Sequence, residues 1–499
     1  MRRVYLNVLA SIFPQAVNIL TNLILPGLII LKFGSELNGL VSTTKSIISC
    51  ITLVGAGIAS AVTQSLYRPV AEGNSAEVKG MLHAAHNMFR KYGIIYCCIT
   101  VVCAAFYPMA LDTDIEPVLI MMLLIVMSLS GASEFFAIGR CRSLLYAHQS
   151  VYICSIVQAI SLLIGLALAL VMLKANASIV LVQLVISGTY VLRGLFLTIL
   201  IKKKYPQYSG YMKVAPIDSA TAKRKDALVH QLSGLAVTAS QTIILSTFVG
   251  LEAASIYSVY NIIYSGLQSI CSNVNTALMP YLGRYYALGE MEKLRTAFGF
   301  LELVFFSAVL VVYATAIYTI IPFVTLYTAG ADIDYVNYAF ATIFAFGSVS
   351  YVLKLPGTSL YNAAGQFKET KSRAIAEAII CTVVSLVMTF FVGLYGVVIG
   401  FTTAVGWRCF DTMAYSNRHV LRTSCNRSLK RVCIVYGVIA LASWMGVVIP
   451  FTANGYLEWL FAAGLTALFY TVLAILLNLI FNRDESIQLF RRLSVKAKH

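Results

Sequence analysis

The sequence predicts an all-α integral membrane protein that crosses the bilayer about fourteen times. Apolar residues make up 59% of the 499 residues, and charged residues make up only 12%. One soluble core cannot bury so much apolar surface, so most of these side chains must be solvated by lipid. The apolar residues also gather in long runs, each near the roughly twenty residues that a helix needs to cross the hydrocarbon layer.

Charged breaks divide the apolar runs into separate spans. The first run follows Arg2 and Arg3 as a signal peptide would, but it exceeds twenty residues and lacks a small-residue cleavage site, so we expect it to be retained. The expected spans cover residues 6–31, 39–65, 93–111, 117–139, 150–173, 178–201, 228–249, 255–280, 297–325, 335–359, 374–393, 395–415, 432–450 and 457–481. Between them, residues 67–92 have the spacing of an amphipathic helix on the inner membrane surface.

The basic residues predict the orientation. With the N-terminus in the cytoplasm, nearly all of the 37 Lys and Arg residues fall in inner segments, which places both termini in the cytoplasm of a cell membrane protein. The net charge of +16 therefore reflects topology, and we expect no nucleic-acid partner.

An internal repeat predicts two lobes. Residues 36–73 align without gaps with residues 252–289, at an offset of 216, and both copies begin with Glu and end with Gly. Six spans separate the copies, which indicates parallel repeats about an axis along the membrane normal. The expected organisation is an N-terminal lobe of six spans, a basic cytoplasmic linker, a C-terminal lobe of six spans, two additional spans and a cytoplasmic tail, at 1–201, 202–227, 228–415, 432–481 and 482–499.

The layout and two local segments resemble a known superfamily. The segments are Phe-Gly-Ser-Glu-Leu-Asn-Gly-Leu at 33–40 and Ser-Leu-Tyr-Arg-Pro-Val-Ala-Glu-Gly-Asn at 65–74. They resemble the multidrug/oligosaccharidyl-lipid/polysaccharide (MOP) exporter superfamily, and within it the polysaccharide (Wzx-type) flippases and the lipid II flippases. The resemblance implies a V-shaped pair of bundles that alternates between inward- and outward-open states. It also implies a polyprenyl-pyrophosphate-linked oligosaccharide as substrate, with the sugar in a central cavity. In lipid II flippases two extra helices form a groove for the lipid tail, a role that spans 13 and 14 could share.

Three basic residues inside spans are candidates for substrate binding: Lys45, Arg193 and Lys354. An ionisable side chain in hydrocarbon costs at least ~2.5 kcal/mol, so each is expected to face protein or water. A guanidinium at position 193 could hold a phosphate through paired hydrogen bonds, and Lys45 could act as a mobile point charge. For Lys354, snorkelling to the inner surface is the competing interpretation.

Acidic residues are candidates for gating or coupling. Glu134 is the candidate for proton or sodium coupling, although pairing of the span residues Glu134, Glu302, Glu377 and Asp411 with inner Lys or Arg is the stronger alternative. The repeated pair Glu36 and Glu252 could form gate contacts with Lys32 or Lys45, or could cap the helices that follow.

Polar and helix-breaking residues complete the candidate site. In the first span, Asn18 and Asn22 are expected to line the cavity and Pro26-Gly27 to bend the helix, because proline removes a backbone donor. Pro356-Gly357 is a second candidate hinge, with a static kink as the alternative. Tyr260, Asn261 and Tyr264 could stack on sugar rings and bond their hydroxyls, although some tyrosines would instead sit in an interfacial belt.

Several functions lack support. No CxxC motif, Cys/His cluster, P-loop, HExxH or GxSxG occurs, so we expect no catalytic residue, no metal and no cofactor. The expected partners are a lipid-linked oligosaccharide, H⁺ or Na⁺, and membrane lipids, with a monomer as the transport unit. Two alternatives stay open: a drug/cation antiporter of the same superfamily, and a membrane glycosyltransferase or polysaccharide polymerase.

Overall fold

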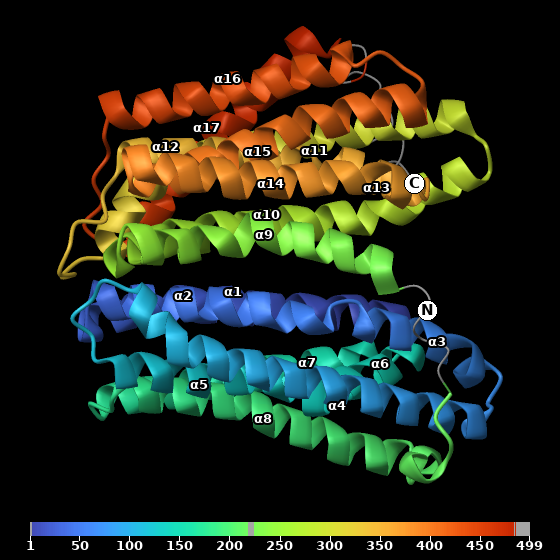
Figure 1. Cartoon of the computed structure of the whole chain (residues 1–499). Helices are drawn as coiled ribbons and strands as arrows, with labels where there is room; N and C mark the ends of the chain where they lie inside the picture. Colours follow the sequence, from blue (N-terminus) through green and yellow to red (C-terminus); the bar gives the residue numbers. More distant parts are fainter. Residues whose placement is uncertain (1, 218–223, 484, 486–499) are drawn as a thin grey trace. The chain divides into compact units, whose positions relative to one another are not determined.

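The computed structural model describes residues 2–217, 224–483 and 485, and all regular secondary structure in that part is helical (Figure 1). The prediction of an all-α fold is confirmed. Contacts divide the chain into two compact units. Unit 1 comprises residues 1–258 with 331–333, and unit 2 comprises 259–330 with 334–499.

Unit 1 contains nine α-helices among its described residues, together with the start of α10. They are α1 (Arg2–Phe33), α2 (Ser35–Thr52), α3 (Ile58–Ala71), α4 (Ser75–Phe106), α5 (Pro117–Ser133), α6 (Gly139–Ala147), α7 (Val151–Lys174), α8 (Ile179–Lys204) and α9 (Arg224–Phe248). A π-helical turn, η3 (Glu134–Ile138), joins α5 to α6, and the short 3₁₀ turns η1 (Leu53–Gly55), η2 (Tyr107–Ala110), η4 (Pro206–Tyr208) and η5 (Tyr211–Lys213) occupy connections.

Unit 2 contains the rest of α10 (Leu251–Ala287) and seven further α-helices among its described residues. They are α11 (Met291–Tyr327), α12 (Tyr338–Leu353), α13 (Leu355–Ala363), α14 (Phe367–Val392), α15 (Leu394–Tyr415), α16 (Asn426–Val448) and α17 (Tyr456–Phe481). A second π-helical turn, η6 (Ser416–Leu421), follows α15.

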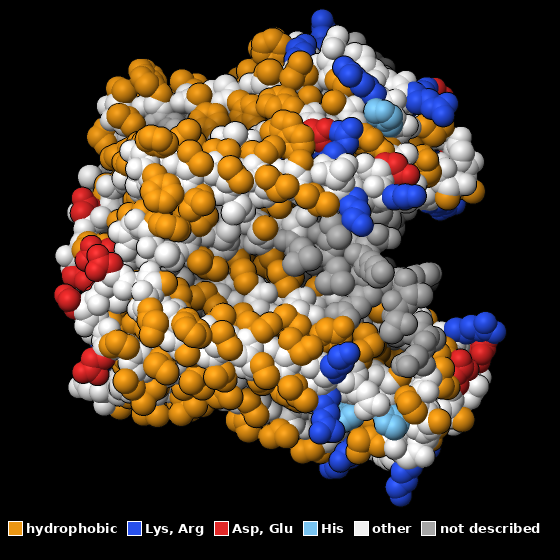
Figure 2. Space-filling model, viewed as in Figure 1, with side chains coloured by type: hydrophobic (Ala, Val, Ile, Leu, Met, Phe, Trp, Pro, Cys, Tyr) orange, Lys and Arg blue, Asp and Glu red, His pale blue; other side chains and the backbone are white. Residues whose placement is uncertain are grey.

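Eleven helices in the described part are long and apolar enough to cross a membrane. The other three expected spans, at 228–249, 255–280 and 395–415, coincide with α9, α10 and α15, which fall outside that set. Within each unit, apolar side chains cover most of the visible helix surface, and Lys and Arg gather toward one end of the helices (Figure 2). Such an apolar surface with basic residues at one end is typical of a multi-pass membrane protein.

The repeat seen in the sequence is also present in the backbone. Gly34 and Gly250 both have positive φ and immediately precede α2 and α10, and Gly73 and Gly289 share a φ of 71°. Glycine adopts this left-handed conformation without the steric cost of a Cβ. Each pair of glycines is separated by the same offset of 216. The turns at the two ends of the repeated segment therefore recur in both copies.

The two copies differ in the middle of the helix. We expected one span over 39–65, but α2 ends at Thr52, and the chain turns through η1 before α3 begins at Ile58. Gly57 permits this break because its φ is +76°, a value that side chains disfavour. In contrast, α10 runs without interruption from Leu251 to Ala287.

The predicted amphipathic surface helix at 67–92 is wrong in its placement. From Ser75 onward these residues form the first part of α4, which continues as one helix into the expected third span. The apolar face of this part, including Val78, Leu82 and Phe89, is buried in a protein cluster with Leu66 and Leu144. This face therefore stabilises unit 1 and does not anchor the chain to lipid.

The described part of the expected linker folds onto α4. His83 Nδ1 lies 2.6 Å from the carbonyl oxygen of Val214, and the Ile217 amide donates to the Gly80 carbonyl at 3.1 Å. A Cβ on Gly80 would lie 2.7 Å from the Ile217 side chain, so the absence of a side chain allows this close approach. Residues 205–217 are thus part of the packed unit.

In unit 2 the two additional helices attach to α11, α16 through the ion pair of Arg431 with Glu302 at 2.9 Å and α17 through two hydrogen bonds. Trp459 Nε1 in α17 donates to the Thr319 carbonyl at 2.9 Å, and Asn478 Nδ2 donates to Ser307 Oγ at 2.7 Å. Tyr470 and Ala474 are the buried residues of α17, and most of its other side chains are exposed. An apolar helix with so little buried surface needs lipid around it.

Candidate functional site

The polar face of α2 carries an exposed cation. Ser42, Lys45, Ser46 and Ser49 lie three or four residues apart, which places them on one side of the helix. The opposite side is buried in unit 1 through residues such as Leu40 and Ile47. Lys45 is exposed, and its amine makes no hydrogen bond or ion pair with any residue in the described part.

The depth of Lys45 makes this exposure informative. It lies ten residues after Ser35, the first residue of α2, which is about 15 Å along the helix axis. This distance is half of a ~30 Å hydrocarbon layer, so the amine would be too deep to reach the interface easily. A charge held there without a protein partner requires water or an anionic ligand.

The equivalent face of α10 is polar but uncharged. Asn261, ten residues after Leu251, occupies the position that corresponds to Lys45 at the offset of 216. Asn261 is half-buried, and Ser265, one turn further along, is exposed. Of the aromatic and amide side chains predicted on this helix, only Asn261 remains accessible to a ligand.

Tyr260 and Tyr264 do not fit the predicted sugar-binding role. Both rings are fully buried in unit 2, where they pack against Phe340 and Phe344 of α12. The Tyr260 hydroxyl donates to the Tyr335 carbonyl at 2.9 Å, and the Tyr264 hydroxyl donates to the Ala341 carbonyl at 2.8 Å. Their stripe therefore joins α10 to α12, because each hydroxyl satisfies a backbone acceptor in an apolar interior.

Helix α1 contributes two side-chain amides at a similar depth to Lys45. Asn22 is exposed and Asn18 is half-buried, and Asn22 Nδ2 donates to Asn18 Oδ1 at 3.4 Å. Pro26 and Gly27 are both buried, and α1 runs unbroken past them from Arg2 to Phe33. Asn22 lies about as far before Gly34 as Lys45 lies after it, so the two residues share a depth in unit 1.

Arg193 lies in the interior of unit 1 and not on an exposed face. Its side chain is 9% exposed, Nη2 donates to Gln158 Oε1 of α7 at 3.2 Å, and Nε has no partner in the described part. The nearby carboxylate of Glu134, in η3, pairs with Arg142 at 2.5 Å. The predicted exposure of Arg193 to a cavity is thus not found, since the packing of α7 and α8 encloses it.

Lys354 is enclosed by an ion network in unit 2 and does not snorkel. Its amine pairs with Glu377, whose other oxygen lies 3.5 Å from Arg408 Nε. Arg408 also pairs with Asp411 at 2.5 Å, and Arg373 pairs with the same Asp411. Three cations and two carboxylates, from α14, α15 and the junction of α12 with α13, thus share one largely buried cluster, in which every charge has an opposite partner.

The candidate hinge beside Lys354 is a tightly packed break. The helix is interrupted between α12 and α13, where Pro356 removes a backbone donor. A Cβ on Gly357 would lie 2.8 Å from Thr412 and 2.9 Å from Ser416 Oγ, and the Ser416 hydroxyl donates to the Gly357 carbonyl. Gly357 therefore permits close packing of α13 on the end of α15.

The predicted gate residues have other contacts. Glu36 accepts a hydrogen bond from Thr113 Oγ1 at 2.5 Å, Glu252 is exposed, and the Lys32 amine donates to the Leu173 carbonyl. The α2 N-terminus is capped by Asp332, which accepts from the Ser35 amide at 3.0 and 3.1 Å and from its hydroxyl. Burial alone would raise the pKa of Asp332, but the hydrogen bonds from Ser35 outweigh it and lower the pKa below its ordinary value.

Comparisons with solved structures identify the fold. A multidrug-resistance MATE transporter of the MOP superfamily in an inward-facing conformation aligns with a TM-score of 0.66 at 13% identity, over 83% of this chain and 99% of its own. The lipid II flippase MurJ aligns with a TM-score of 0.65 at 13% identity, over 96% of this chain and 99% of its own. The chain has the fold of the MOP-superfamily transporters.

A Vibrio cholerae MATE transporter shares this MOP fold less closely, with a TM-score of 0.57 at 14% identity, over 84% of this chain and 98% of its own. No protein-family profile matches the sequence, and no curated protein matches it. Among these three structures, the MurJ alignment covers the largest share of the chain. The MOP fold here therefore extends beyond the part shared with the MATE structures.

Proposed function

We propose that this protein is a flippase that moves a polyprenyl-pyrophosphate-linked oligosaccharide from the cytoplasmic to the outer leaflet by alternating access, for export of a surface polysaccharide. The observation that carries the proposal is Lys45, an exposed cation near the middle of α2 whose amine has no hydrogen-bond or ion-pair partner in the described part of the chain. A pyrophosphate must lose much of its hydration to cross a low-dielectric layer, and a fixed cation lowers that cost.

Each of the predicted binding residues that is accessible has a role in this proposal. Lys45 binds the pyrophosphate as a point charge, which can follow a moving phosphate better than a rigid guanidinium fork. Asn18, Asn22 and Asn261 offer amides that bond sugar hydroxyls or phosphate oxygens. Arg193 and Lys354 act through packing and ion pairing within their own units, since both are enclosed by protein.

The pairing of the acidic residues favours an anionic substrate over a cationic one. The four carboxylates within the expected spans lie toward the inner ends, and all are paired with Arg or Lys in the described part: Glu134, Glu302, Glu377 and Asp411. A drug/cation antiporter needs an accessible anion in its path, and none of these four offers one. Glu134 remains the candidate for H⁺ or Na⁺ coupling, through exchange of its partner Arg142.

The extent of the fold also supports a lipid-linked substrate. MurJ, a lipid II flippase by name, aligns over 96% of this chain, whereas the MATE transporter with the highest TM-score here aligns over 83%. The helices α16 and α17 lie at the C-terminal end of the chain, and α17 presents a long apolar surface that a polyprenyl tail could contact.

Deletion of the gene in its native host tests the function. We expect an undecaprenyl-linked oligosaccharide to accumulate on the cytoplasmic leaflet and surface polysaccharide to fall, because the flipping step is blocked. Extracted lipids would be analysed by mass spectrometry, with the complemented strain as control. A strain that accumulates no such lipid but becomes sensitive to cationic drugs would contradict the proposal and support the antiporter.

A further inference from the structure

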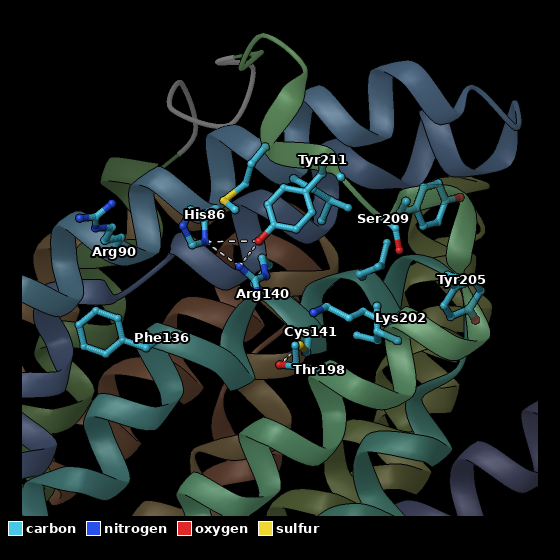
Figure 3. A pocket seen from close by; sticks show the side chains of 16 residues that line it. His86, Arg90, Phe136, Arg140, Cys141, Thr198, Lys202, Tyr205, Ser209 and Tyr211 are labelled. Carbon is cyan, nitrogen blue, oxygen red and sulfur yellow. Dashed lines mark hydrogen bonds between the residues drawn. The ribbon is translucent and has the colours of Figure 1, made fainter.

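A cavity of about 740 Å³ lies in unit 1, between α4, α6 and α8 and the segment 205–212 (Figure 3). It lies at the basic end of these helices, which the distribution of Lys and Arg assigns to the cytoplasmic side. Tyr205, Tyr208 and Tyr211 line it from the turns that pack on α4. None of the residues proposed to bind the transported substrate lies in its lining.

The charge of the cavity is unbalanced. Arg90, Arg140 and Lys202 line it, and none of its sixteen lining residues is Asp or Glu. In Figure 3 the amine end of Lys202 points toward Arg140, which comes from a different helix. Two like charges that face one cavity repel each other, and an anion between them would remove this repulsion.

The guanidinium of Arg140 is held in position by His86 and Tyr211, and no carboxylate of the described residues pairs with it. Its Nη1 donates to His86 Nδ1 at 2.6 Å and to the Tyr211 hydroxyl at 2.5 Å, and the group lies 5.1 Å from the centre of the Tyr211 ring. Because arginine can only donate, the His86 Nδ1 must accept here. These neutral partners orient the cation and leave its charge available to a ligand.

One side of the cavity adjoins surface that lipid would cover. Phe136 lines the cavity and is 46% exposed, and Ile94 of α4 is 51% exposed. A Cβ on Gly93, the neighbour of Ile94, would lie 2.9 Å from the Phe136 ring, so Phe136 packs on this part of α4. A molecule with a phosphate head and an acyl tail therefore fits both surfaces at once.

We propose that this cavity binds the phosphate headgroup of an anionic phospholipid from the cytoplasmic leaflet, at a site separate from the transport path. Basic pockets between membrane helices at the cytoplasmic side are suited to such headgroups. Arg140 and Lys202 contact the phosphate, the three tyrosines offer hydroxyls to the glycerol or headgroup, and the acyl chain lies along Phe136. The bound lipid ties the segment 205–212 to α6 and α8 and stabilises unit 1.

Native mass spectrometry of the purified full-length protein tests this site, with phosphatidylglycerol, phosphatidylcholine or sodium phosphate added to the detergent solution. We expect phosphatidylglycerol to bind more tightly than phosphatidylcholine. Lys202→Ala should weaken it about fivefold and the Arg140→Ala/Lys202→Ala double variant roughly thirtyfold, because each basic residue near an anionic headgroup contributes a similar factor. Lys202 is exposed and has no protein partner in the described part, so the single variant should keep its fold.

Two control variants separate this site from other basic residues and from transport. Lys203→Ala removes an exposed neighbouring lysine that is not in the cavity lining, and Lys45→Ala alters the proposed transport site, so both should bind phosphatidylglycerol as the wild type does. Equal affinity of the wild type and the double variant would overturn the proposal. Binding of sodium phosphate without binding of phosphatidylglycerol would also overturn it, and would assign the cavity to a soluble phosphate.

Discussion

Replacement of Lys45 by alanine is expected to reduce export of the surface polysaccharide by about tenfold to a hundredfold, the loss that corresponds to one charge-assisted hydrogen bond. The Lys45 amine makes no hydrogen bond or ion pair in the described part, so its removal breaks no ion pair. Export would be measured in a deletion strain that carries the variant gene, with the amount of membrane-inserted protein determined by immunoblot.

Two further variants define the cause of this loss. Lys45→Arg keeps the positive charge and should retain part of the activity, although its bulkier fork suits a fixed phosphate better than a moving one. Ser49→Ala alters the same exposed face one turn away and should export normally, because the Ser49 hydroxyl bonds the Lys45 carbonyl within the helix at 2.9 Å. Normal export by Lys45→Ala would remove the physical basis of the proposed substrate.

Replacement of Glu377 by alanine is expected to lower the stability of the protein by about 3–5 kcal/mol, because it leaves buried cations without their carboxylate. The Lys354 and Glu377 side chains are 11% and 9% exposed, and Arg408 is 4% exposed. After the substitution, Lys354 would lose its carboxylate partner, and Asp411 alone would pair with Arg373 and Arg408. Thermal unfolding of the purified protein in detergent, followed by size-exclusion chromatography, would measure the loss.

Matched variants show whether burial causes that loss. Glu72→Ala removes the carboxylate of an exposed pair with Arg68, whose side chains are 51% and 85% exposed, and should change the unfolding temperature little. Lys354→Met combined with Glu377→Ala removes both partners and should recover part of the stability, since no lone lysine then remains buried. An equal effect of Glu377→Ala and Glu72→Ala would show that the network contributes no more than surface charges.

The span pattern could be predicted because it is local. Length and hydropathy alone set whether a segment can cross a membrane, so helices such as α7 and α17 lie within a few residues of their expected bounds. The repeat was visible for a related reason, since Gly73 and Gly289, which end its two copies, occupy turns that glycine adopts most easily. The break at Gly57 has no counterpart in hydropathy and was missed.

The partners of the candidate residues could not be predicted in the same way. Whether Arg193 faces a cavity or Gln158 depends on how α7 and α8 pack, and the sequence shows no rule for their relative rotation. The stripe of Tyr260 and Tyr264 indicated one helix face correctly, but not that Phe340 and Phe344 would cover it. The exposure of Lys45 could be predicted, in contrast to the surroundings of Arg193. Its neighbours on the same helix face, such as Ser49, are also polar, and this pattern is visible in the sequence.

Two features depend on contacts between segments far apart in the chain. Asp332 caps α2 although 297 residues separate it from Ser35, and no motif around either residue indicates the pairing. The basic cavity of unit 1 forms because residues 205–212 fold back over α4 and α6, whereas the sequence suggested only a charged linker. Tertiary contacts of this kind need coordinates, because neither periodicity nor composition encodes them.

Translocation in proteoliposomes tests the central claim most directly. The purified protein would be reconstituted with a polyprenyl-pyrophosphate-linked oligosaccharide, and the sugar exposed at the outer surface would be followed with an impermeant enzyme or lectin. We predict that the wild type moves the lipid-linked sugar across the bilayer and that Lys45→Ala does so about tenfold to a hundredfold more slowly. Wild-type vesicles that translocate no more than protein-free ones would contradict the assignment.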